Sequence, residues 1–141
     1  MLLLKTRLEN IPGVLETSKH ATHYPPKAEP GDLVLIAITR NTLPKRQKSI
    51  QYIARFRGLR PDHTGESIDI WKHPWRYIVE LDDIEEVSPF NLEEVQASNT
   101  DYRYVRTHCR LRLEDEQVVL RWLGQARPER KAAEGPPQWR T

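Results

Sequence analysis

Cysteine is almost missing from this 141-residue sequence, which contains only Cys109. A single cysteine cannot form an internal disulfide, and it cannot supply a cysteine-based zinc site. Its neighbours, His108 and Arg110, provide no recognisable partner for nucleophilic catalysis. We therefore interpret Cys109 as a structural residue, in keeping with the tendency of unpaired cysteines to be buried.

Long hydrophobic runs are also missing. No segment approaches the length of a membrane span, and the apolar start, Met1–Leu4, is too short for a signal peptide. We therefore expect a cytoplasmic protein without a membrane partner. Glycine is scarce, with 6 residues, and none of them forms a phosphate-binding loop. The length predicts one folded domain.

Charge of one sign is not in excess, because 22 basic and 20 acidic residues leave a net charge of +2. The distribution is more informative than the total. Basic residues without any acid fill the stretch 40–60, and acids dominate the stretch 80–94. This separation predicts one basic and one acidic side of the domain.

Three stretches have the patterns of β-strands. Pro30–Thr39 begins with turn residues and continues as an apolar run, which predicts a central strand buried on both faces. Ile50–Leu59 and Trp75–Leu81 alternate between apolar and polar residues, as strands with one buried face do. In the former we expect Ile50, Tyr52, Ala54 and Phe56 to point the same way. Leu2–Leu4 predicts a further strand.

The remaining segments are expected to connect or cover these strands. Residues 7–19 indicate a short helix that could begin at Pro12, and 20–30 and 60–74 indicate loops. Ser88-Pro89 would open a short helix, and residues 110–113 could form a last short strand. Glu114–Leu123 has an apolar helical stripe followed by Gly124 as a plausible end. We expect the domain to cover 1–124 and a disordered polar tail or linker to cover 125–141.

Several short motifs resemble the EVE domain of the PUA-like superfamily, which also contains YTH, ASCH and SRA-type domains. They are Gly31-Asp32-Leu33-Val34-Leu35, Ile53-Ala54-Arg55-Phe56, Pro61-Asp62, the strand opening at Trp75, and Pro89-Phe90-Asn91-Leu92-Glu93-Glu94. The resemblance covers roughly residues 2–123. It implies an α+β fold, a small mixed β-barrel with flanking helices. It also implies a pocket for a flipped or single-stranded base, often a modified one, between aromatic walls.

Candidate site residues follow from this implied pocket. The base-pocket candidates are Trp71, Tyr24, Thr39, Asn41 and Trp75, and the phosphate-binding candidates are Arg40, Lys45, Arg46 and Lys48. Each has a simpler structural alternative. Trp71 could anchor a loop, Trp75 could belong to the core, and Thr39 and Asn41 could cap a strand end. The basic run could be an ordinary solvated face.

The function that these expectations favour is a non-catalytic module that binds nucleic acid, with a modified base as the favoured ligand. Such a module would act as a specificity or sensor domain for a fused or associated effector. No cofactor, metal or catalytic residue is predicted, since the five histidines show no convergent ligand set. Two alternatives stay open: a small ASCH-type ribonuclease, and a protein-interaction domain that uses the acidic side. The choice between DNA and RNA also stays open.

Overall fold

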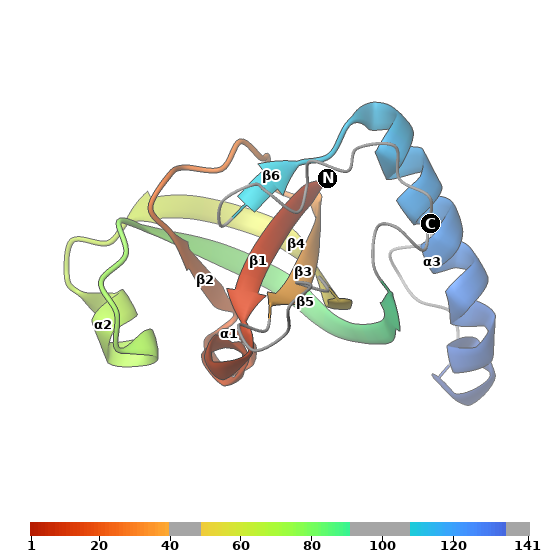
Figure 1. Ribbon diagram of the computed structural model, residues 1–141, viewed down its shortest axis with the longest axis horizontal. Coiled ribbons are helices and arrows are strands. Elements are labelled where there is room, and N and C mark those ends of the chain that lie inside the picture. The colour runs from red at the N-terminus through yellow and green to blue at the C-terminus, as the bar shows by residue number, and fades with distance from the viewer. Residues whose placement is uncertain (40–48, 91–107, 135–141) are drawn as a thin grey trace.

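A six-stranded mixed sheet organises residues 1–39, 49–90 and 108–134, the part of the chain that this computed structural model describes (Figure 1). The strands lie in the order β2-β5-β4-β3-β1-β6. Their bounds are β1 (Leu2–Arg7), β2 (Lys19–Thr22), β3 (Leu33–Thr39), β4 (Ser49–Pro61), β5 (Tyr77–Phe90) and β6 (His108–Arg110). The α+β class is therefore confirmed, in the form of an open hydrogen-bonded sheet with β2 and β6 as its edges.

The predicted central strand is confirmed as β3. It pairs in parallel with β1, where Leu35 lies opposite Leu3, and antiparallel with β4. The turn before it depends on Gly31, which has a φ of 93° that favours glycine. Every residue from Leu33 to Ile38 is buried, because both faces of β3 are covered.

Two apolar clusters cover the two faces of the sheet. Successive side chains of β1 and β3 point to opposite faces of the sheet. Leu3 and Leu35 therefore belong to the first cluster, whereas Leu2 and Val34 belong to the second. The first cluster includes side chains of the C-terminal helix, and the second includes Ile11 and Val14 of the first helix. The sheet is thus the middle layer between two packed faces.

Three helices and a short 3-10 turn accompany the sheet in the described part of the chain. They are η1 (Leu8–Asn10), α1 (Ile11–Thr17), α2 (Glu66–Trp71) and α3 (Leu113–Glu134). The predicted short helix near Pro12 is confirmed as α1. Figure 1 shows α2 and α3 at opposite ends of the sheet. None of the helices described here is long and apolar enough to cross a membrane.

Several expected boundaries were wrong. The segment predicted as a loop at 20–30 begins with β2, because His20 pairs with Val79 of β5. The loop predicted at 60–74 contains α2, and Gly124 lies within α3 rather than after it. Ser88 and Pro89 belong to β5, which continues to Phe90. The predicted continuation of that helix lies in 91–107, outside the described residues.

The expected alternation of β4 was also wrong in part. Ile50 packs in the first apolar cluster, whereas Ala54 and Phe56 pack in the second. The register of β4 against β5 shifts at three places between Ile50 and Gly58. Each such irregularity changes which residues face a given side, so a strict period of two cannot persist along the strand.

Candidate functional site

Three aromatic rings from two loops meet beside β2 and β5. His23 follows β2, and His73 and Trp75 lie between α2 and β5. The His23 imidazole stacks on the Trp75 indole, with ring centroids 4.4 Å apart and planes 29° apart. His73 stands edge-on to both, at 5.8 Å from His23 and 4.9 Å from Trp75. His73 is exposed, and the other two side chains are partly exposed. We call His23, His73 and Trp75 the aromatic cluster.

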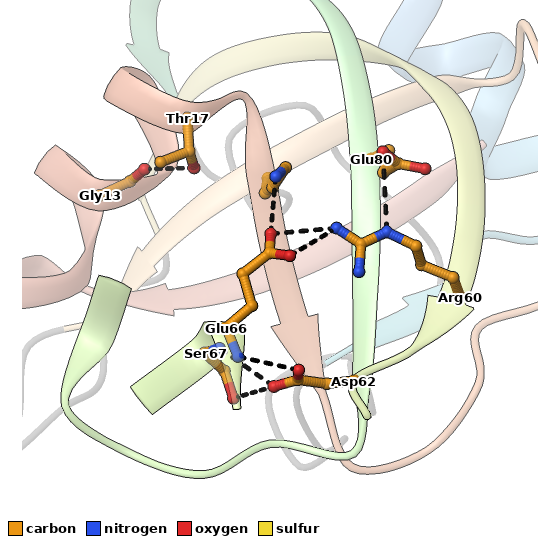
Figure 2. Close-up of polar contacts among 8 residues, drawn as sticks. Gly13, Thr17, Arg60, Asp62, Glu66, Ser67 and Glu80 are labelled. Carbon is orange, nitrogen blue, oxygen red and sulfur yellow. Dashed lines mark hydrogen bonds and ion pairs between the residues drawn. The ribbon is translucent and has the colours of Figure 1, made fainter. Parts of the chain in front are cut away.

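A polar network holds the backbone of Trp75, and Figure 2 shows the part of this network around Asp62 and Ser67. The Asp62 carboxylate accepts hydrogen bonds from the backbone N–H groups of Glu66 and Ser67, at 2.9 and 3.0 Å, and from Ser67 Oγ at 2.6 Å. Ser67 Oγ in turn accepts a hydrogen bond from the Trp75 backbone N–H at 2.9 Å. These bonds, led by that of the Ser67 hydroxyl, lower the pKa of Asp62 to about 2.

A second set of charges ties α2 to the sheet. Glu66 accepts hydrogen bonds from Lys19 of β2 at 2.6 Å and from Arg60 of β4 at 2.8 Å, and Arg60 Nε lies 3.8 Å from Glu80 of β5. The hydrogen bond from Lys19, with help from Arg60, lowers the pKa of Glu66. The hydrogen bond to Glu66 raises the pKa of Arg60. These side chains are already paired with one another, so we interpret them as the support of the aromatic cluster.

The loop that carries His23 is held from two sides. Thr22 Oγ1 donates a hydrogen bond to the Tyr24 carbonyl oxygen at 2.7 Å, and His108 Nε2 of β6 lies 2.9 Å from the same oxygen. Burial lowers the pKa of His23, and His73 and Arg76 lower it further by repulsion. The His23 imidazole is therefore neutral at pH 7.

The five base-pocket candidates do not all come together. Trp75 lies in the aromatic cluster, and Tyr24, which is 51% exposed, directly follows His23. Trp71 instead faces α1: its Nε1 donates a hydrogen bond to the Asn10 carbonyl oxygen at 3.2 Å. A Cβ at Gly13 would lie 2.7 Å from that indole nitrogen, so glycine permits this close approach. These contacts favour the loop-anchor alternative for Trp71, and its role in a pocket stays a prediction.

The other candidates lie at or beyond the end of β3. Thr39 is the last residue of that strand, opposite Arg7 of β1. Asn41 and the phosphate-binding candidates Arg40, Lys45, Arg46 and Lys48 lie outside the described residues. Arg76, a cation next to Trp75 in the sequence, lies close enough to the aromatic cluster to repel a proton on His23.

The sequence analysis did not predict that His23 and His73 contact Trp75. Fifty positions separate them, and only the pairing of β2 with β5 brings them together. Within the described residues, no three His, Cys, Asp or Glu side chains converge as a metal site would require.

Of three comparisons with known proteins, only the comparison with solved structures found similar proteins. No protein-family model matches the chain, and no curated protein sequence matches it. Among solved structures, ASCH from Zymomonas mobilis matches with a TM-score of 0.60 and 15% identity, over 84% of this chain and 92% of that one. The fold is ASCH-like.

Two variants of the same Zymomonas mobilis protein give the same result. A tyrosine-to-phenylalanine variant matches with a TM-score of 0.60 and 14% identity, over 84% of this chain and 95% of the other. A serine-to-alanine variant matches with a TM-score of 0.59 and 14% identity, over 86% and 94%. The fold therefore agrees with the α+β fold that the sequence resemblance implied, and it is similar to that of ASCH domains, whereas the assignment to EVE domains is not confirmed.

Proposed function

We propose that this protein is a nucleic-acid-binding module that holds a base, with a modified base favoured, against aromatic side chains. The observation that carries the proposal is the aromatic cluster, partly exposed on an ASCH-like fold. Nucleobases present flat faces that stack on aromatic rings, whatever the identity of the base. An indole and two imidazoles at a protein surface therefore suit such a ligand.

The residues divide into two proposed roles. Trp75 and Tyr24 would contact the base, together with Trp71, Thr39 and Asn41 if the pocket extends to the end of β3. Arg40, Lys45, Arg46 and Lys48 would contact phosphates, which mainly set affinity and position. We include in the proposal the closure of the sheet into a barrel. It is supported by the contact of 2.7 Å between Thr6 Oγ1 of β1 and His20 Nε2 of the edge strand β2.

Nucleic-acid binding is tested by fluorescence anisotropy with labelled 12-nucleotide RNA and DNA strands, unmodified and modified, at two salt concentrations. Binding should weaken as salt increases. For each phosphate contact, a tenfold increase in salt concentration should lower the logarithm of the affinity by about 0.7. Changing Arg40, Lys45, Arg46 and Lys48 together to Gln should flatten this dependence. Changing Arg112 and Arg121, two exposed arginines outside the basic stretch 40–60, to Gln is the control. No binding of any strand at low salt would overturn the proposal.

A ribonuclease of ASCH type is the second candidate function, because the similar solved structures named above are of an ASCH protein. The described Lys19, Arg60 and Glu66 are engaged with one another, which favours a supporting rather than a catalytic role. Incubation of the protein with end-labelled RNA in the presence of a chelator decides between the two. Intact RNA that stays bound supports the module, and cleavage that co-purifies with the protein supports the enzyme.

A further inference from the structure

We propose that His23, His73 and Trp75 form a stacking subsite for one unpaired nucleobase of a single strand, with Arg76 beside it to contact the adjacent phosphate. This inference rests on the proposed function and adds two histidines to it. It narrows the flipped or single-stranded base implied by the sequence resemblance to a base of a single strand, and it places that base beside β2 and β5.

The arrangement of the rings supports a subsite of this shape. His23 and Trp75 lie nearly parallel at 4.4 Å, and His73 is inclined by 74° to His23 and by 64° to Trp75. Two stacked rings with a third standing at their side form a flat face bordered by a wall. A base placed against the stack would continue it, and its edge would meet the imidazole of His73.

Packing in the apolar core does not account for the position of Trp75. Among the described residues, Trp71 packs against the second apolar cluster, whereas Trp75, only four residues later, is in neither cluster. The segment is held instead by its backbone, through the hydrogen bond from Trp75 N–H to Ser67 Oγ. The rings are thus positioned by polar contacts and left at the surface, where a ligand can reach them.

The charges around the cluster suit an uncharged base next to an anionic phosphate. The pKa of His23 is lowered by burial, His73 and Arg76, so its imidazole is neutral at pH 7. Arg76 is exposed and always charged, and it supplies the positive charge at this place. Stacked pairs inside a duplex do not offer a free face to such a site, which is why the ligand must be unpaired.

The experiment measures binding of a labelled 12-nucleotide single strand and of its duplex to the full chain. Trp75→Ala should weaken binding of the single strand about tenfold or more, because stacking of one base contributes that much. His23→Ala and His73→Ala should each weaken it severalfold. His63→Ala is the matched control, since His63 is exposed in the neighbouring loop between β4 and α2. The duplex should bind the wild type at least tenfold more weakly.

Tryptophan fluorescence provides a second readout. The single strand should quench the wild type, and Trp75→Phe should remove that quenching while it keeps binding within about threefold, because a phenyl ring still stacks. Melting of each variant is recorded first. If Trp75→Ala does not fold, His73→Ala decides, since the His73 side chain is exposed.

The outcomes separate the subsite from the general function. Unchanged affinity of the folded cluster variants for a strand that the wild type binds would overturn the subsite and leave nucleic-acid binding standing, without this cluster as the place of the base. Equal binding of single strand and duplex would do the same. Failure of the wild type to bind any strand would overturn both.

Discussion

The helices at the two ends of the sheet are held by opposite kinds of contact. At one end, α2 has six residues, of which only Ser67 is buried, and its contacts to the sheet include the ion pairs of Glu66. At the other end, α3 inserts Val119 and Leu123 into the first apolar cluster, and Trp122 lies against Phe90 with ring centroids 6.1 Å apart. Ion pairs and hydrogen bonds are prominent at the α2 end, where Trp71 also packs against the second apolar cluster. Buried apolar side chains are prominent at the α3 end, where Glu116 also pairs with the N-terminus.

This difference separates stability from positioning. Burial of apolar side chains contributes free energy without fixing one orientation, whereas hydrogen bonds are directional and define where their partners lie. We infer that the α3 end mainly stabilises the sheet, and that the α2 end mainly sets the geometry of Trp75. Substitutions at the α3 end should therefore mainly change global stability, and substitutions at the α2 end should mainly change the local structure around Trp75.

The largest effect is expected from Leu123→Ala at the α3 end. Leu123 is 1% exposed, and removal of a buried leucine side chain lowers the free energy of unfolding by about 2–5 kcal/mol. Urea titration of the variant measures this loss, while nucleic-acid binding under native conditions should persist. Leu120→Ala is the control, because Leu120 is 44% exposed and should matter by less than about 0.5 kcal/mol. A loss at Leu123 no larger than that of the control would contradict the comparison.

Acid should act on the sheet itself, through the buried His20 of β2, whose ring lies against Thr6 of β1. Burial lowers the pKa of His20 to about 4, so the unfolded chain, with a histidine pKa of 6.5, binds the proton more readily. Stability is complete above pH 6.5 and decreases as the pH falls towards 4, by about 3 kcal/mol from this group. His23 and His108, whose pKa values are also lowered, act in the same direction.

Urea titrations between pH 7 and pH 4.5 check this expectation. His20→Gln should reduce the dependence on pH, and His63→Gln should not, because His63 is exposed. Identical pH profiles for the wild type and His20→Gln would show that burial of His20 is not the cause.

The smallest effect on global stability is expected from Asp62→Ala, with a loss of about 1 kcal/mol for a helix-capping residue. Because hydrogen bonds lower the pKa of Asp62 to about 2, its contribution is present above pH 4 and disappears as the pH falls towards 2. Hydrogen exchange should show the loss concentrated in residues 66–76. Asp69→Ala, an exposed acid on the same helix, is the control. A uniform change across the sheet would argue against separate roles for the two ends.

Local sequence patterns were sufficient for most of the sheet. The apolar runs of β1 and β3 and the start of β5 were predicted, because burial on one or both faces leaves a pattern in consecutive residues. β2 was missed because four residues show no clear alternation, and its pairing with β5 is a tertiary interaction. α2 was missed because six residues are too few for a helical period, although Asp62 four positions before Glu66 is consistent with capping.

The candidate site was only partly predictable for the same reason. Tyr24 was predicted in a loop and Trp75 at the start of a strand, which begins instead at Tyr77. The structure stacks Trp75 on His23, and Tyr24 is the next residue after His23 in the sequence. His23 and His73 gain their meaning from convergence, which depends on strand pairing. The tryptophans Trp71 and Trp75 look alike in the sequence, yet one contacts α1 and the other the histidines.

The neighbours of β1 have a consequence for how the chain folds. Its two partners are β3, about 30 residues later, and β6, more than 100 residues later. The antiparallel strands β3, β4 and β5 follow one another along the chain, so they can pair early with short loop closures. On a ribosome, β1 would emerge first and yet complete its pairing last, when His108–Arg110 becomes available. Until β6 is available, the backbone hydrogen-bonding groups on one edge of the apolar strand β1 have no partner. We expect the nascent chain to need a chaperone most during this interval.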